Sequence, residues 1–343
     1  MIILSTHGEL SVLAVLMVLT GLASCRNDLV VMAPYKDIPV VYCLLNPKDS
    51  NQYVRLEKSF LGADNAYEMA RQTDSIYYKG AVVFLERWTD GERMEQVVLE
   101  RVTGPVRDQG VFTGDPNYLY QLSSPIRGNS EYRLNIKIPS TGAEISATTH
   151  TINDFKVIRP ETFKKNLPFS SYDNYLTVEW ITAPFTRIYS LLIRFHYLEI
   201  TGEDTANLTA DWDAGRYISG TDVGGELMSA EILQRNFYKW LGNKLDKPSP
   251  AVHRLANKKA IDLVFTVGGE ELYTYMEIYK ADGGLPREKP VFTNINNGIG
   301  LFSSRLEQAV IGKSLSDHSI DSLAYGIYTK GLRFADSQNP YYF

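Results

Sequence analysis

Hydrophobic and polar side chains alternate along much of the first half of the chain. The segment 52–58 alternates, as a half-buried β-strand does. The turn pair Asp90-Gly91 separates two strand-like segments, which predicts a β-hairpin. Segments of strand length are found at 40–45, 52–58, 81–88, 94–102, 118–122, 131–138 and 144–149. This number of short strands within residues 38–150 predicts an immunoglobulin-like β-sandwich.

The second half of the chain is also predicted to be rich in strands. Residues 151–170 are interpreted as a linker with Pro160 and Pro168 as breakers, and residues 171–343 as a second β-rich domain. Its strands are expected at 175–180, 189–200, 259–268, 271–280 and 323–334. The polar stretch 201–226, rich in Gly, Asp and Thr, is expected to be a long loop outside the core.

One helix is predicted in this second domain, near residues 229–243, with Ser229 as its N-cap. Four apolar side chains recur there at helical spacing: Leu233, Phe237, Trp240 and Leu241. The sequence therefore predicts a mainly β protein, in which an immunoglobulin-like sandwich precedes a second β-rich domain with one inserted amphipathic helix.

The N-terminal segment carries an export signal. Residues 10–24 form an apolar stretch that is too short to span a bilayer and ends in small residues. The tetrad 22–25, Leu-Ala-Ser-Cys, resembles the bacterial lipobox, in which the cysteine receives the lipid. We therefore expect residues 1–24 to be a lipoprotein signal peptide, Cys25 to be the acylated residue, and 25–37 to be its tether. A secreted protein or a membrane anchor with an incidental cysteine is the alternative, and the lack of Lys and Arg before Leu10 departs from the usual pattern.

Composition excludes several classes of protein. The chain of 343 residues has 35 Lys and Arg against 40 Asp and Glu, so its net charge of −5 does not favour nucleic-acid binding. Only two cysteines are present, and lipidation of Cys25 would leave Cys43 without an intramolecular disulfide partner. Five scattered histidines do not form a metal-binding motif, so we expect neither a metal nor a cofactor.

No catalytic motif stands out. The chain contains no GxSxG elbow, HExxH, P-loop or CxxC sequence. Glycoside hydrolysis needs two nearby carboxylates, and Glu179, Glu199 and Glu277 are candidates that nothing in the sequence brings together. We therefore expect a protein that is not an enzyme, with a hydrolase as the less favoured alternative.

Aromatic residues are the most suggestive candidates for a binding surface. If 272–279 is a strand, Tyr273, Tyr275 and Tyr279 share one face and are available to a partner protein or a sugar. Trp212 and Tyr217, in the polar stretch, could stack on a glycan. Ordinary cross-strand packing of these rings is the alternative interpretation.

Four segments carry a resemblance to a known family. They are VVYCLLNPKDSNQYVRLEKSFLG from residue 40, GAVVFLERWTDG from residue 80, GVFTGDPNYLY from residue 110 and PVFTNINNGIGLF from residue 290. Together they resemble the domain-of-unknown-function family 4249 among outer-membrane lipoproteins of Bacteroidota. The resemblance implies a lipoprotein with an N-terminal immunoglobulin-like domain and a further β-rich domain, often accompanying TonB-dependent transporters. It implies no catalytic residues.

These observations lead to one main functional hypothesis. We expect a non-enzymatic outer-membrane lipoprotein, anchored through Cys25 and facing the cell surface, with the periplasmic face as the alternative location. It would act as an accessory or binding subunit of an envelope complex, with an outer-membrane β-barrel transporter or assembly protein as partner. A surface glycan-binding lipoprotein is the alternative.

Overall fold

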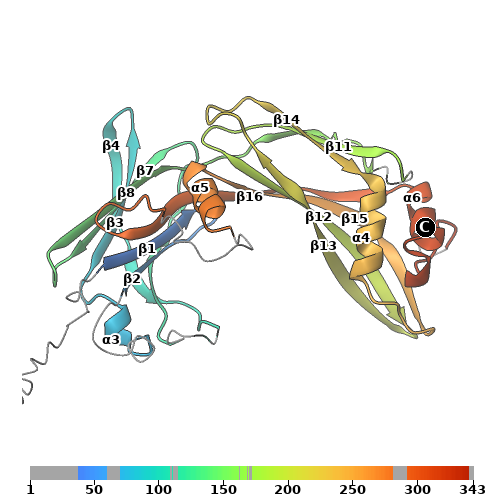
Figure 1. The fold of residues 1–343 in the computed structure, drawn as a ribbon, viewed down its shortest axis with the longest axis horizontal. Helices are drawn as coiled ribbons and strands as arrows, with labels where there is room; N and C mark the ends of the chain where they lie inside the picture. Colours follow the sequence, from blue (N-terminus) through green and yellow to red (C-terminus); the bar gives the residue numbers. More distant parts are fainter. Residues whose placement is uncertain are drawn as a thin grey trace, which may run out of the picture.

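The computed structural model describes residues 38–59, 70–108, 110, 115–161, 163–167, 169, 172–280 and 292–339. The predicted signal peptide and the tether with Cys25 lie outside these residues. The protein is mainly β, as the sequence predicts, and consists of two β-sandwiches that lie side by side and are joined by one long strand (Figure 1).

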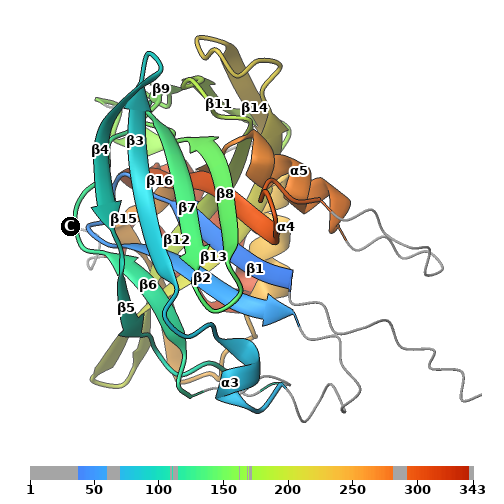
Figure 2. The same ribbon diagram turned by 90° about the vertical axis from the view of Figure 1, so that its left-hand side faces the viewer.

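The N-terminal sandwich has two layers built mostly from the first half of the chain. Its strands are β1 (Ile38–Leu45), β2 (Gln52–Ser59), β3 (Val82–Thr89), β4 (Glu92–Val98), β5 (Glu100–Thr103), β6 (Tyr118–Leu122), β7 (Glu131–Ile138) and β8 (Ala143–His150). One layer has the order β4-β3-β7-β8 and lies over β1 and β2 of the other layer (Figure 2). Period-two alternation buries one face of each layer, so Val41, Cys43 and Leu45 face Leu134 and Ile136 in a shared core. Helix α3 (Thr73–Ile76) lies beside this sandwich.

The predicted hairpin at Asp90-Gly91 is confirmed. Strands β3 and β4 pair antiparallel up to Thr89 and Glu92. Asp90 and Gly91 have φ angles of 51° and 82°, the two positive values that a type I′ turn requires.

The C-terminal sandwich is built around a larger core. Its strands are β9 (Lys156–Arg159), β10 (Asn166–Leu167), β11 (Tyr175–Ile181), β12 (Ile188–Thr201), β13 (Asp204–Ile218), β14 (Leu227–Leu233), β15 (Val252–Gly268) and β16 (Ile299–Leu315). The layer β14-β11-β9 packs on the layer β13-β12-β15-β16, with Trp180, Tyr189 and Phe265 fully buried between them. Helix α4 (Gln234–Lys244), helix α6 (Asp317–Tyr325) and the 3₁₀ turn η1 (Lys330–Leu332) lie at the outer end of this sandwich (Figure 1).

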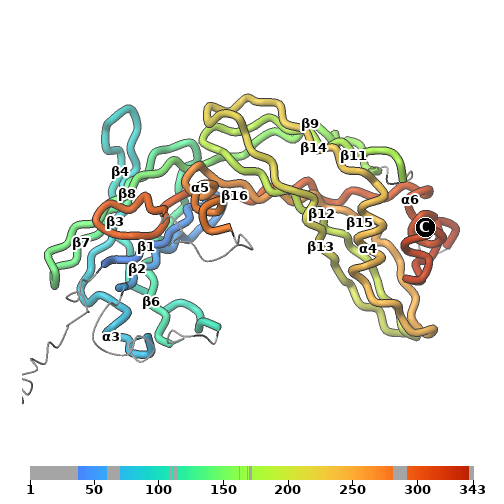
Figure 3. Tube along the Cα trace, viewed as in Figure 1, coloured from blue at the N-terminus to red at the C-terminus, as the bar shows by residue number. Residues whose placement is uncertain are grey.

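Strand β16 belongs to both sandwiches. Its first residues, Ile299 to Ser304, pair parallel with Val40 to Leu45 of β1. Its later residues, from Arg305 onward, pair antiparallel with β15. The strand crosses from one sandwich to the other in the tube trace (Figure 3). The N-terminal sandwich therefore includes a strand from outside residues 38–150, and β9 and β10 lie within the segment interpreted as a linker.

The predicted strand at 271–280 is wrong, because this segment forms helix α5 (Glu270–Ile278). Gly269 is its N-cap, and the carboxylates of Glu270 and Glu271 lie in its first turn, where the helix dipole favours negative charge. Leu272, Tyr275, Met276 and Tyr279 are spaced at i, i+3, i+4 and i+7, so the same letters also fit a helix.

Three further boundaries differ from prediction. Residues 204–218, which were expected to be part of a loop, form β13. This strand is held by backbone pairing with β12, while many side chains of β13 remain exposed. The predicted helix begins at Gln234 rather than near Ser229, because 227–233 is strand β14 paired with β11. The last predicted strand, 323–334, is instead the end of α6 followed by η1.

Candidate functional site

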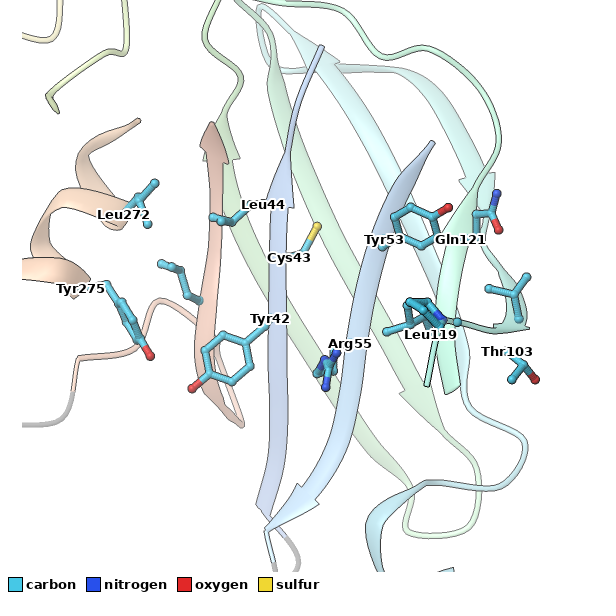
Figure 4. Close-up of a pocket in the computed structure, with 14 residues that line it drawn as sticks. Tyr42, Cys43, Leu44, Tyr53, Arg55, Thr103, Leu119, Gln121, Leu272 and Tyr275 are labelled. Carbon is cyan, nitrogen blue, oxygen red and sulfur yellow. The ribbon is translucent and has the colours of Figure 1, made fainter. Parts of the chain in front are cut away.

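A groove of about 790 Å³ lies on the outer face of the N-terminal sandwich (Figure 4). Its floor is the sheet formed by β16, β1, β2, β6 and β5, one wall is α5, and the opposite rim is the segment 103–105. Concave, mostly apolar sites are where proteins most often bind ligands.

Two rows of outward side chains form the floor. In the first row, Tyr42 of β1 is paired with Leu301 of β16 on one side and with Arg55 of β2 on the other. Farther along the same row, Leu119 of β6 is paired with Val102 of β5. The second row contains Leu44, Tyr53 and Gln121, of which the last two are directly paired. Tyr42, Leu44 and Tyr53 are 40%, 38% and 45% exposed. The groove therefore presents large apolar side chains to solvent.

The apolar run at 40–45 explains why these side chains are there. Alternation turns Val41, Cys43 and Leu45 into the core and leaves Tyr42 and Leu44 on the opposite face. A strand with one solvated face normally alternates with polar residues. The apolar run therefore indicates that β1 packs on the core with one face and offers the other face to a further contact.

Helix α5 is held against β16 by side-chain hydrogen bonds and by close packing. The Glu271 carboxylate accepts hydrogen bonds from Ser303 of β16 (2.9 Å) and Thr149 of β8 (3.1 Å). At Gly268 a Cβ atom would lie 2.7 Å from Leu272 Cδ2, so the absence of a side chain lets the helix approach the sheet. These contacts fix the wall of the groove on rigid elements.

Three tyrosines cluster where α5 meets the floor. Tyr275 points toward Tyr42 (Figure 4), with ring centroids 6.2 Å apart and nearly perpendicular, and Tyr279 lies 4.5 Å from Tyr275. Burial, followed by a hydrogen bond with Tyr275, raises the pKa of Tyr42 well above its ordinary value of 10.0. Tyr42 is therefore uncharged at neutral pH, and the cluster offers aromatic rings with hydroxyl tips.

Arg55 is the one charged side chain among the described residues that line the groove. Glu57 accepts hydrogen bonds from both Arg55 and Arg107 on the same carboxylate oxygen. The Arg55 contact is long, at 3.4 Å, while Arg107 is closer and also donates to the Tyr77 hydroxyl at 2.8 Å. Arg55 thus lies in the floor with only a weak contact to this shared carboxylate.

The structure separates the residues that the sequence nominated as a binding surface. Tyr275 and Tyr279 lie at the groove, whereas Tyr273 lies under the Arg187 guanidinium, 5.5 Å from it. Trp212 stacks on Trp240 of α4, with centroids 6.0 Å apart. Tyr217 packs edge-on against Trp180 at 5.3 Å. The rings of Trp212 and Tyr217, which were considered for glycan stacking, are therefore partly covered by contacts with the core of the C-terminal sandwich.

The candidate carboxylates for hydrolysis are each engaged in an ion pair. Glu179 contacts Arg159 at 3.3 Å, Glu199 contacts Arg254 at 2.8 Å, and Glu277 contacts Lys280 at 3.5 Å. Within the described ranges, no group of three or more His, Cys, Asp or Glu is arranged to hold a metal ion. In that part of the chain, no helix is both long and apolar enough to span a membrane.

Cys43 provides a prediction about pH. Burial raises the pKa of its thiol to about 12 from an ordinary 9.0, so the unfolded chain ionises at lower pH than the folded one. Its contribution to stability is complete below about pH 9 and is lost as pH rises toward 12. We compare the unfolding free energy of a Cys25→Ser protein with that of the same protein carrying Cys43→Ala as well. Between pH 8 and 10.5, the free energy of the protein with Cys43 should fall by about 2 kcal/mol relative to the Cys43→Ala protein. Denaturant titrations at the two pH values measure this difference, and an unchanged difference would contradict the prediction.

Comparison with known proteins identifies a family. The family model described as "Domain of unknown function (DUF4249)" matches residues 30–308, most of the chain. No curated protein matches. Among solved structures, the C-terminal globular domain of an oligosaccharyltransferase from Pyrococcus abyssi aligns with 63% of this chain at 11% identity and a TM-score of 0.23. The alignment spans 41% of that chain, and a TM-score this low does not establish a common fold.

Proposed function

The chain belongs to the DUF4249 family, and on this premise we propose that it is a non-enzymatic binding protein of the cell envelope. The groove between α5 and the 103–105 rim is its binding surface. One observation carries the proposal: three large apolar side chains, Tyr42, Leu44 and Tyr53, are exposed together on a floor of paired strands. Clusters of exposed apolar side chains in a recess are typical of surfaces that bind a partner or a ligand.

The remaining parts of the proposal concern location and partner. The lipobox-like tetrad supports a lipid anchor at Cys25 and attachment to the outer membrane at the cell surface. A protein fixed there meets outer-membrane β-barrel proteins, so a transporter or assembly barrel is the proposed partner. Its affinity would come from the aromatic and aliphatic side chains of the groove, because such residues dominate the energetics of interfaces.

The anchor is tested by Cys25→Ser. Without the thiol no lipid can be attached, and we expect the variant to be absent from the outer-membrane fraction, whereas Cys43→Ser should remain there if it folds. Fractionation and mass spectrometry of the mature N-terminus measure both. A Cys25→Ser protein that still fractionates with the outer membrane would contradict the anchor.

The groove is tested by the double variant Tyr42→Ser, Leu44→Ser. Loss of two exposed anchors should weaken partner binding by at least about 30-fold, because one central interface residue alone contributes about 2 kcal/mol or more. The matched control is Tyr175→Ser, Ile311→Ser, which removes exposed apolar side chains (56% and 73%) from the other sandwich.

The readout is affinity purification from native outer membranes in mild detergent, followed by mass spectrometry. We expect a stoichiometric partner with the wild-type chain and the control, and none with the groove variant. A wild-type chain that purifies alone, or a groove variant that retains the partner, would overturn the proposal.

A further inference from the structure

The groove has features that specify the form of what it binds. Resting on the function proposed above, we infer that it receives an amphipathic α-helix of the partner protein. The helix presents an apolar stripe to the floor and an acidic side chain to Arg55.

Backbone pairing is the first argument for a helix. The floor strands lie side by side in the order β16-β1-β2-β6-β5, so β1, β2 and β6 each have a strand on both sides. At the β16 margin the Asn294 side chain hydrogen-bonds with the backbone N–H and C=O of Phe302, and the β5 edge lies at the rim. A segment lying across the floor therefore finds no backbone groups to pair with. Buried backbone N–H and C=O groups need partners, and a helix satisfies them internally.

The dimensions of the floor agree with this inference. Five adjacent strands span about 19 Å at ~4.8 Å per strand. Helix α5 already rests on this face, and beneath it Leu301 and Ser303 are buried. The strip left open, where Tyr42, Leu44 and Tyr53 are exposed, leaves space for one more helix of ~10 Å diameter beside α5.

Charge gives the helix its acidic residue. Arg55 lies in the floor beside Tyr42 and contacts Glu57 only at 3.4 Å, while Arg107 contacts the same oxygen more closely. One carboxylate is thus shared by two guanidinium groups, and a second carboxylate on the occupant would complete the pairing of Arg55.

The same floor suits a glycan poorly. A sugar needs hydrogen-bond partners for its hydroxyl groups, and the floor is mainly Leu44, Leu119, Val102 and tyrosine rings. The amide of Gln121, the one carboxamide in the lining, already donates to Asn51 and Ser123, each at 2.8 Å.

Site-specific photo-crosslinking tests the inference on the full-length chain in its native membrane. p-Benzoylphenylalanine replaces Tyr53 in the floor or, as a control, Tyr175 on the other sandwich. The expected result is a crosslink from position 53 alone, mapped by mass spectrometry to one partner segment. That segment should carry apolar residues at i, i+3, i+4 and i+7 with an Asp or Glu beside the stripe.

A charge test follows on the same captured pair. Arg55→Gln should lower the crosslinking yield about tenfold. Arg133→Gln, the matched control, should change it less than twofold, because Arg133 also pairs with a glutamate two residues away but lies on the opposite layer. Reversal of both charges, with Arg55→Glu and Lys in place of the partner's acidic residue, should restore the yield.

The outcomes separate this inference from the proposed function. If the partner co-purifies but position 53 crosslinks to nothing, the helix inference is wrong and the proposed function stands. A crosslink to glycan, lipid, a second copy of the chain, its own residues or a partner segment without helical spacing also overturns the inference. If no partner co-purifies at all, both are wrong.

Discussion

Replacement of Gly300 by alanine is expected to destabilise the protein by more than about 4 kcal/mol. Gly300 sits opposite Val41 where β16 pairs with β1, and it has a φ of +126° that side chains rarely tolerate. A Cβ atom there would lie 1.9 Å from the Val41 carbonyl oxygen, and this obstacle is backbone rather than a flexible side chain. The parallel pairing of β1 and β16 would have to separate to admit the methyl group.

The control for this prediction lies on the same strand. Gly312 also has a positive φ, +72°, but a Cβ atom there would meet only the Lys259 side chain, at 3.2 Å. Gly312→Ala should therefore cost about 1–2 kcal/mol, the strain of the backbone alone. Denaturant unfolding followed by circular dichroism compares the two variants, and equal losses would show that the close approach at Val41 has no special cost.

Trp180→Ala is expected to cost about 3–5 kcal/mol of unfolding free energy. Trp180 of β11 is fully buried at the centre of the C-terminal sandwich, with ring centroids 5.3 Å from Tyr217 and Phe265 and 5.6 Å from Tyr189. Removing the indole leaves a cavity between the two layers that these rings, which are held by their own strands, cannot fill.

The matched control removes a tryptophan from the surface. Trp88 of β3 is half-buried, and its ring lies against the Arg133 guanidinium at 3.8 Å. Trp88→Ala should cost about 1 kcal/mol, the amount of a partly exposed cation–π contact. Urea midpoints measure both variants, and a Trp180 variant no less stable than the Trp88 variant would contradict the assigned core.

The parts of the fold that depend on neighbouring residues were predictable. Asp90-Gly91 specifies its turn locally, and the alternation of apolar and polar residues identifies strands such as β2 and β7. Strand β13 was missed because backbone pairing with β12 holds it, which leaves no apolar pattern to detect. The joining of β1 to β16 could not be predicted either, since no local signal links residues more than 250 positions apart.

Helix α5, the wall of the groove, shows how the strand propensity of individual residues can mislead. The aromatic and β-branched letters of 272–279 favour a strand, but Gly269 followed by two glutamates marks a helix start. Tyr275 and Tyr279 were therefore nominated for a strand face that does not exist. Their position beside Tyr42 comes from the packing of α5 on β16, which only the tertiary structure shows.

The floor of the groove was within reach of the sequence. The apolar run at 40–45 places Tyr42 and Leu44 on the face opposite the core residues, which signals a second buried or binding face. Arg55 and Tyr53 follow from the alternation of β2. The pairing that aligns these residues in rows is set by the register between strands, and composition contains no information about it.

The shared strand determines how the molecule carries mechanical load. Strands β1 and β16 run parallel, and the chain enters β1 from the side of Cys25, while β16 continues into the C-terminal sandwich. A pull between the N-terminal end of β1 and the far sandwich acts in opposite directions along these two strands. The hydrogen bonds between them are then sheared together rather than opened one after another, so the junction resists tension as a unit.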